Sequence, residues 1–82
     1  MLTLKIVSPE RIEFQGEVDL VRVPGAMGSF EILMNHAPIV SLLEKGMVEY
    51  TIGHDKTELQ IDGGFVEVKK NEVSLCVELT KE

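Results

Sequence analysis

The chain has 82 residues, of which 44% are hydrophobic and 27% charged, proportions typical of one small globular domain and not of a disordered chain. Fourteen acidic residues against eight basic ones give a net charge of −6 at pH 7, so the basic stripe of a nucleic-acid-binding protein is missing and anionic membrane surfaces are disfavoured. No apolar run approaches the roughly 18 residues of a membrane span, and residues 1–5 lack the apolar block of a signal peptide, which favours a protein that stays where it is made and binds other proteins.

Three short segments at the start of the chain predict β-strands. They cover residues 2–7, 11–14 and 18–23. Pro9 ends the first, Gly16 the second, and the turn dipeptide Pro24-Gly25 the third. The third segment is a β-branched run whose alternation slips between Leu20 and Val21, which indicates a bulge or burial on both faces.

The second half of the chain predicts further strands with tight turns between them. The strands cover residues 47–52, 57–61, 65–69 and 73–79, separated by turns at 53–56, 62–64 and 70–71. Asn71 is able to take the positive φ that a two-residue hairpin loop needs. Residues 37–45 fit one helical turn or a buried strand equally well, and we favour a strand.

Short strands with turns every eight to twelve residues or so are typical of an all-β antiparallel β-sandwich or flattened barrel. We therefore expect a single domain over residues 1–82. Period-two spacing places nine side chains largely in its core: Leu2, Leu4, Ile6, Val48, Tyr50, Ile52, Val73, Leu75 and Val77.

No residue set supports a catalytic, cofactor or metal site. His54 is expected to be exposed at a hairpin tip, and no Cys or His pair has a metal-ligand spacing. His36 lies in an irregular loop and must hydrogen-bond something; without a nearby nucleophile or carboxylate, we expect it to brace the loop or to contact an interface. The single cysteine, Cys76, cannot form an internal disulfide. Gly63-Gly64 indicates a turn, a bulge or a close approach of two chains.

The segment from Pro24 to Pro38 is predicted to be a long loop, and it is unusually apolar. Its large apolar residues are Met27, Phe30, Ile32, Leu33 and Met34. Such a segment either packs down as part of the core or meets a partner protein, and methionines suit adaptable contacts.

Residues 23–40 read VPGAMGSFEILMNHAPIV. This stretch resembles the signature of the epsilon subunit of the rotary proton-translocating ATP synthase, in which a Pro-Gly turn is followed by a glycine-rich segment, a second Pro-Gly and His-Ala-Pro. Further matches lie in register across nearly the whole chain, at residues 4–10, 45–48, 62–68 and 71–75.

The chain departs from the family pattern at three places. Glu31 stands where the family prefers glycine, which places a charge in a segment that the family keeps bare. Met34-Asn35 replaces Pro-Gly, and asparagine can keep the positive φ of the glycine. The sequence stops at Glu82, whereas typical members continue into a hairpin of two helices, so we expect neither the hairpin type of inhibition of ATP hydrolysis nor tight nucleotide binding.

The resemblance implies a ten-stranded β-sandwich clamped to the foot of the gamma subunit and set against the polar loops of the membrane c-ring. Such a subunit is not catalytic; it passes torque and couples proton flow to ATP synthesis, as a peripheral protein on the cytoplasmic face of a bacterial plasma membrane. The gamma-facing positions of the family fall on Ser8, His36 and Ser41, and the ring-facing loop falls on Met27, Gly28 and Ser29. No cofactor, nucleic acid, small-molecule substrate or direct membrane insertion is implied.

Two alternatives of other classes stay open at this stage. One is a free-standing ligand- or protein-binding β-barrel module, which would purify as a stable monomer without a synthase. The other is a small enzyme, for which an activity dependent on His36 would be needed.

Overall fold

Alternating apolar and polar side chains fold this chain into eight strands, with no helix among the residues described. The computed structural model describes residues 1–80. The strands are β1 (Leu2–Val7), β2 (Ile12–Val18), β3 (Leu20–Gly25), β4 (Gly28–Ile32), β5 (Ile39–Leu43), β6 (Gly46–Ile52), β7 (Asp55–Lys69) and β8 (Glu72–Leu79).

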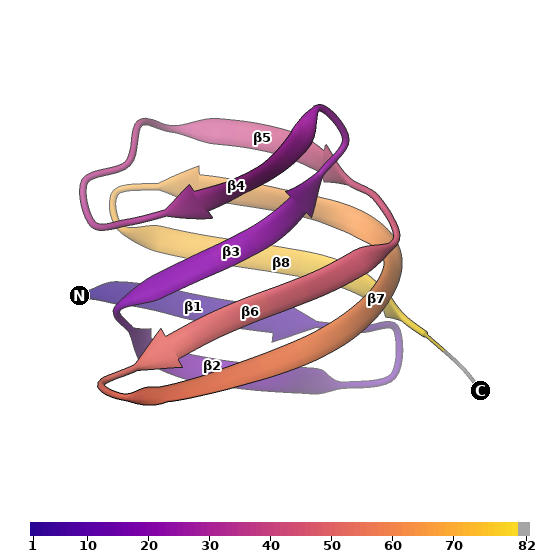
Figure 1. Cartoon of the computed structure of the whole chain (residues 1–82), viewed down its shortest axis with the longest axis horizontal. Coiled ribbons are helices and arrows are strands. Elements are labelled where there is room, and N and C mark those ends of the chain that lie inside the picture. The colour runs from indigo at the N-terminus through magenta and orange to yellow at the C-terminus, as the bar shows by residue number, and fades with distance from the viewer. Residues whose placement is uncertain (81–82) are drawn as a thin grey trace.

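The strands form a flattened barrel with two layers (Figure 1). The hydrogen-bonded order is β2-β1-β8-β7-β5-β3-β4, and β6 pairs with both β3 and β7. We call β2, β1, β8, β5 and the second half of β7 the back layer, and β4, β3, β6 and the first half of β7 the front layer. The long strand β7 therefore belongs to both layers and joins them.

The expected all-β sandwich is confirmed, with two corrections to its detail. Eight strands are described, fewer than the ten that the family resemblance implies. The sheet is also mixed, because β1 and β8 run parallel, with Leu4 opposite Val73 and Ile6 opposite Leu75. A parallel pair needs a long crossover connection, and here six intervening strands supply it.

The bend of β7 depends on Gly63 and Gly64. The sequence predicts a turn that separates two strands here, but β7 is continuous, with a register shift between Ile61 and Gly63 where it pairs with β8. A Cβ on Gly64, whose φ is +150°, would lie 2.1 Å from the carbonyl oxygen of Cys76. Two of the three expected roles of the glycine pair, a bulge and a close approach of two chains, are thus both present.

The core is entirely apolar. Of the nine predicted core residues, seven are buried: Leu2, Leu4, Ile6, Val48, Val73, Leu75 and Val77. Tyr50 is half-buried, packs against the core and stacks on Phe14 with ring centroids 4.4 Å apart. The prediction is wrong for Ile52, which is 42% exposed at the end of β6, next to the turn that leads into β7.

Strand boundaries differ from the predictions in the first third of the chain. β2 does not end at Gln15-Gly16 but continues to Val18, because Gly16 pairs directly with Leu4. The predicted third segment divides at Asp19, where the chain passes from the back layer to the front layer (Figure 1). This crossing explains the slip in alternation, because Val18 and Val21 both point into the core from different layers.

The turn predicted at Pro24-Gly25 is wrong, because both residues lie in β3 and the turn follows at Ala26-Met27. The turn predicted at 53–56 is confirmed only for Gly53-His54, because β7 begins at Asp55. Residues 37–45 contain the strand β5, and Lys70-Asn71 forms a two-residue hairpin loop with φ values of 52° and 62°. The apolar segment from Pro24 to Pro38, predicted to be a loop, contains the strand β4 and so forms a hairpin with β3. Ile32 in this hairpin is core, whereas Leu33 and Met34 are exposed.

Candidate protein-docking surfaces

The outward face of the back layer carries a continuous apolar row. The strand registers place Leu42 opposite Phe65, Phe65 opposite Cys76, Cys76 opposite Val7, and Val7 opposite Ile12. Leu42, Phe65, Cys76 and Val7 point outward, because each has a buried neighbour on its strand. Ile12 joins the row through its pairing with Val7. Leu42 is 70% exposed, Ile12 52% and Phe65 45%. We call this row the outer apolar stripe.

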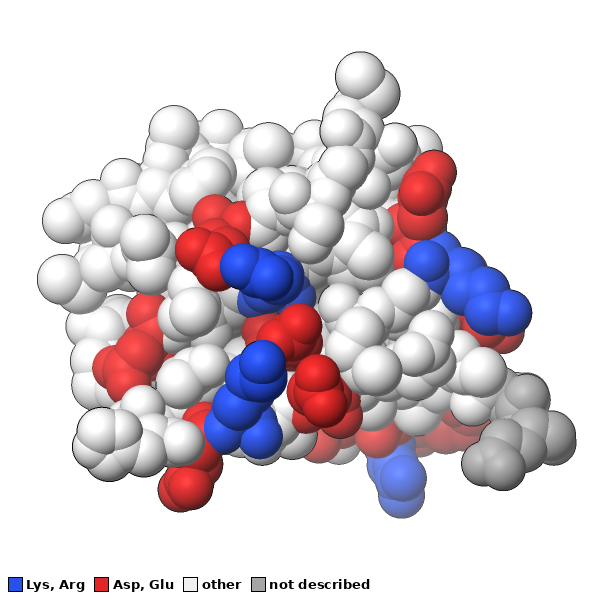
Figure 2. Space-filling model, in the orientation of Figure 1, with Lys and Arg blue, Asp and Glu red and all other residues white. Residues whose placement is uncertain are grey.

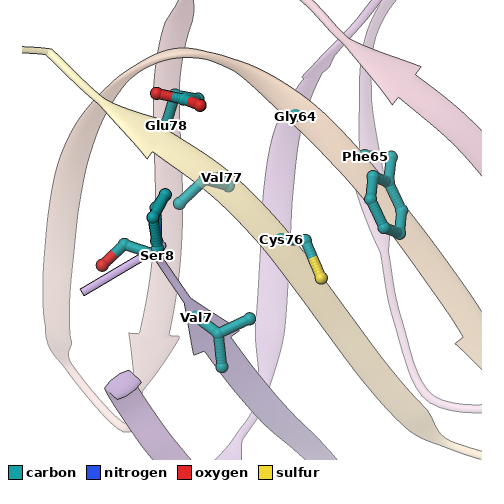
Figure 3. Close-up of a pocket in the computed structure, with 8 residues that line it drawn as sticks. Val7, Ser8, Gly64, Phe65, Cys76, Val77 and Glu78 are labelled. Atoms are coloured by element: carbon teal, nitrogen blue, oxygen red, sulfur yellow. The ribbon is translucent and has the colours of Figure 1, made fainter. Parts of the chain in front are cut away.

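A shallow cavity of about 390 Å³ lies at the middle of the outer apolar stripe. Figure 3 shows the Phe65 ring, the Cys76 sulfur and the Val7 side chain around it, contributed by β7, β8 and β1. Ser8 and Pro9 in the β1–β2 loop, together with Glu78 on β8, complete its rim. The wall is therefore mostly apolar and the rim polar, as in a pocket that receives one apolar side chain of a partner.

The front layer has the opposite character on its outward face. Arg22 donates to Glu31, and Lys56 pairs with Glu49 at 2.9 Å. The register places Arg22 of β3 opposite Glu49 of β6, so the two pairs join into one ladder across the layer. Figure 2 shows basic and acidic side chains alternating over β3 and β6. The pKa of Arg22 is raised, first by its hydrogen bond to Glu31, and that of Lys56 by its hydrogen bond to Glu49.

This ladder explains the Glu31 departure from the family pattern. Glu31 does not stand in a bare loop: it lies on β4, directly opposite Arg22. The four charges of this ladder pair with one another near the surface, which is typical of a solvated face and not of a docking surface.

The β3–β4 hairpin ends in a tip that carries the predicted ring-facing residues Met27, Gly28 and Ser29. All three are exposed, and the relative exposure of Met27 is 101%. The tip is anchored to the end of β5, because the Ala26 amide donates to the carbonyl oxygen of Leu42 at 2.9 Å. An uncharged projection at the top of Figure 2 lies over this hairpin. The tip thus presents a bare methionine beside the β5 end of the outer apolar stripe.

Ser8, the first predicted gamma-facing residue, lies on the rim of the cavity. Its amide donates to the carbonyl oxygen of Arg11 at 2.9 Å, and its hydroxyl donates to Glu13 Oε2 at 2.8 Å. This hydroxyl bond is the largest single cause that lowers the pKa of Glu13, and the hydrogen bond and the charge of the Arg11 guanidinium lower it further. Ser8 therefore orders the β1–β2 loop at one end of the stripe.

His36, the second predicted gamma-facing residue, lies in the β4–β5 loop and is half-buried. Its Nδ1 is 2.7 Å from the carbonyl oxygen of Ala37, and its ring centroid is 6.3 Å from that of Phe30, so the expected hydrogen bond is present. The loop is tethered to the β7–β8 hairpin, because the Asn35 amide donates to Asn71 Oδ1 at 2.6 Å. The φ of 66° at Asn35 confirms that asparagine keeps the backbone geometry expected there.

The three predicted gamma-facing residues do not cluster. From Asn71, near the His36 loop, to Val77, near Ser8, β8 rises by about 20 Å at about 3.3 Å per residue. The loops that hold Ser8 and His36 accordingly lie at opposite ends of the barrel (Figure 1). Ser41 lies on β5 between them, but its side chain points to the side opposite that of Val40 and Leu42.

The outer apolar stripe could not be predicted from any single segment of the sequence. An exposed apolar residue on any one strand is ordinary, and only the register of five strands shows that five such residues are neighbours. The one available signal was in residues 39–43, where apolar side chains occupy both the inward and the outward positions of β5.

Within residues 1–80 no three His, Cys, Asp or Glu side chains gather in a group that could hold a metal ion. No buried side-chain nitrogen or oxygen of this part of the chain lacks a hydrogen-bond partner. The same residues form no helix long and apolar enough to cross a membrane.

Comparison with curated proteins finds ATP synthase epsilon chains among the relatives of this chain. The ATP synthase epsilon chain of Leptospira borgpetersenii is 44% identical over 77 residues, covering 94% of this chain and 61% of the relative. The ATP synthase epsilon chain of Desulfitobacterium hafniense is 40% identical over 76 residues, covering 93% and 58%. The chain thus spans about 60% of the length of these curated relatives.

Two solved assemblies contain chains of the same fold. A chain of the Euglena gracilis mitochondrial ATP synthase (OSCP/F1/c-ring) superposes with a TM-score of 0.88 at 23% identity, over 93% of this chain and 49% of that chain. A chain of the Tetrahymena thermophila mitochondrial ATP synthase central stalk and c-ring superposes with a TM-score of 0.81 at 13% identity, over 94% and 63%. Residues 1–81 match the family described as "ATP synthase, Delta/Epsilon chain, beta-sandwich domain". The chain therefore belongs to the delta/epsilon chain family of ATP synthase.

Proposed function

We propose that this chain is a non-catalytic central-stalk subunit of the proton-translocating ATP synthase. In this proposal it docks on the gamma subunit through the outer apolar stripe and on the c-ring through the tip of the β3–β4 hairpin. It thereby helps to couple proton flow to ATP synthesis, as a peripheral component on the cytoplasmic face of a bacterial plasma membrane. The relatives named ATP synthase epsilon chain support this subunit identity, and the folds found in stalk and c-ring assemblies are consistent with it.

The single observation that carries the proposal is the contrast between the two outward faces. The back layer exposes Leu42, Phe65 and Ile12 in one row, and Val40, which is 70% exposed, lies beside Leu42 on the same face of β5. A small domain gains by covering such a row, because each Å² of apolar surface removed from water contributes about 25 cal/mol. The front layer, with its self-satisfied ion-pair ladder, has no comparable need of a partner.

The predicted gamma-facing residues fit this proposal unequally. Ser8 is on the rim of the central cavity and would lie inside the gamma interface. His36 and Ser41 would contact gamma only if that interface extends around β5 to the β4–β5 loop. We keep all three as proposed gamma contacts, and Met27, Gly28 and Ser29 as proposed ring contacts.

The test is the affinity of the purified chain for the gamma subunit of its own synthase, measured by isothermal titration. Leu42→Asp places a carboxylate at the end of the outer apolar stripe, where docking would bury it without a partner, and we expect at least a tenfold loss of affinity, that is, about 1.4 kcal/mol or more. The matched control is Ile52→Asp, at an exposed apolar residue of the front layer, which should bind as the wild type does. Equal affinity of wild type and Leu42→Asp would contradict docking through the stripe, and a wild-type chain that never binds gamma would contradict the function itself.

A further inference from the structure

Two carboxylates stand on either side of the cavity in the outer apolar stripe. Glu67 lies two residues beyond Phe65 on β7 and points outward with it, because Val66 and Val68 point into the core. Glu78 lies two residues beyond Cys76 on β8, points outward by the same alternation, and lines the cavity (Figure 3). Since Phe65 lies opposite Cys76, and β7 and β8 are antiparallel, the two carboxylates lie on opposite sides of the cavity.

Neither carboxylate has a basic residue directly opposite it in the registers of the described strands. Glu78 lies opposite Gly63, which has no side chain to pair with it, and Glu67 lies between Val40 and Ser74 on the adjacent strands. Among the described residues, neither carboxylate makes an ion pair, whereas Glu13, Glu31 and Glu49 each do.

The basic residues on this outward face do not balance its acids. They are Lys5, whose cross-strand neighbours are Gln15 and Ser74, and Lys69, whose cross-strand neighbour on β8 is Glu72. The remaining acid on this face is Glu17, opposite Thr3. The docking face is therefore apolar in its middle row and negative around it, in a chain whose net charge is −6.

We propose that the partner fills the cavity with one large apolar side chain, and that it carries a Lys or Arg on each side of that residue to reach Glu67 and Glu78. The inference rests on the proposed function, because it takes the outer apolar stripe as the gamma-docking surface; it adds the chemistry that the partner must present there. An apolar partner without the two basic groups would leave both carboxylates partly desolvated and unpaired, which opposes binding.

The registers also give the spacing of the two basic groups. Glu78 lies opposite Gly63, and Glu67 lies four residues further along β7. The two carboxylates are therefore about 13 Å apart along the strand direction, on strands about 4.8 Å apart. The apolar side chain of the partner sits between these points. Its basic groups therefore lie on opposite sides of the apolar residue and do not form one cluster.

The experiment is titration of the purified chain with the gamma subunit of its own synthase, at low and at high salt. The pair Glu67→Gln and Glu78→Gln should weaken binding about tenfold at low salt and remove most of its salt dependence. The control pair is Asp55→Asn and Glu58→Asn, on the exposed first half of β7 in the front layer; it removes the same charge and should leave the affinity unchanged.

The cavity is tested separately from the charges. Cys76→Trp fills it from an outward-facing position, and Phe65→Ala removes one wall; each should weaken binding at least tenfold while the thermal unfolding midpoint stays close to that of the wild type. Phe65→Ala is the second variant, in case the tryptophan disturbs β8.

The outcomes separate this inference from the proposed function. If wild type binds gamma and Leu42→Asp does not, but the glutamine pair binds as tightly as wild type with the same salt dependence, the proposed function stands and this inference is overturned. If wild type does not bind gamma at all, both fail. A dimer of the isolated chain in sedimentation that Phe65→Ala abolishes would also overturn the inference, because it would assign the stripe to a second copy of the chain.

Discussion

At the scale of single residues, Gly64 is the position where β7 and β8 approach too closely for any side chain. A Cβ there would meet the Cys76 carbonyl oxygen at 2.1 Å, and its φ is +150°. We expect Gly64→Ala to lower the free energy of unfolding by about 3 kcal/mol or more, because backbone strain and a backbone clash add. Gly53→Ala is the control: Gly53 has a φ of +61° but open space around it, so it should cost only about 1 kcal/mol. Urea unfolding of both variants measures the difference, and equal losses would show that the approach is not as tight as described.

The Ser8 hydroxyl provides a second residue-scale prediction, on pH. The pKa of Glu13 is lowered, above all by the hydrogen bond from Ser8. Because the carboxyl is more acidic in the folded chain than in the unfolded one, its ionised form favours folding. That contribution is present above the ordinary glutamate pKa and is lost as the pH falls through the lowered pKa.

We expect Ser8→Ala to move the pKa of Glu13 back toward its ordinary value, as read from the carboxyl carbon shift in an NMR titration. The Arg11→Ala variant should also move it in that direction, since both the hydrogen bond and the charge of the Arg11 guanidinium lower the pKa of Glu13. If Ser8→Ala leaves the titration of Glu13 unchanged, the hydrogen bond within the β1–β2 loop is not formed in solution.

At the scale of elements, the β7–β8 hairpin holds the β4–β5 loop in place. Asn71 lies in the β7–β8 hairpin with φ at 62°, and its Oδ1 accepts from the Asn35 amide. Asn71→Asp keeps both the acceptor and the tolerance of positive φ, whereas Asn71→Gly keeps only the backbone conformation. Hydrogen exchange at the Asn35 amide should therefore quicken about fivefold in Asn71→Gly, as expected for the loss of a bond of about 1 kcal/mol, and stay slow in Asn71→Asp. Fast exchange in the wild type would contradict the tether.

A strand could be predicted from the sequence where the alternation of its own residues reveals its buried face. Features that depend on the neighbouring strand could not. The alternation of Leu2, Leu4 and Ile6 shows their burial directly, since a strand buries every second residue on one face. The exposure of Ile52 and the bulge after Ile61 depend on which strand lies opposite, and the local pattern contains no such information. The division at Asp19 was visible only as a slip in alternation, because the same residues suit a bulge and a change of layer equally well.

For the candidate site the same limit applies more strongly. Motif resemblance could point to Ser8 and Met27 because their neighbours in the chain form the motif. The outer apolar stripe joins residues as distant in sequence as Val7 and Cys76, which become neighbours only through the parallel pairing of β1 with β8. Long-range register is a property of the folded sheet, so no single segment of the sequence could have shown the stripe.

At the scale of the whole molecule, the two proposed docking surfaces meet at one corner but use different side chains. The β3–β4 tip is anchored to β5 through backbone atoms alone, from the Ala26 amide to the carbonyl oxygen of Leu42. The Met27 side chain is fully exposed and leaves the packing of the domain unaffected. We therefore expect Met27→Asp to change the free energy of unfolding by less than about 0.5 kcal/mol and to leave the affinity for gamma unchanged.

The same substitution should weaken the binding of the chain–gamma complex to the detergent-solubilised c-ring, because the new carboxylate would be buried at that contact without a partner. Met47→Asp, at a half-exposed methionine of β6 in the front layer, is the control and should bind the ring normally. Combined with Leu42→Asp, Met27→Asp should add no further loss of gamma affinity, since the two side chains serve different partners. If Met27→Asp instead weakens gamma binding as much as Leu42→Asp does, the tip belongs to the gamma surface, and the ring must contact another part of the barrel.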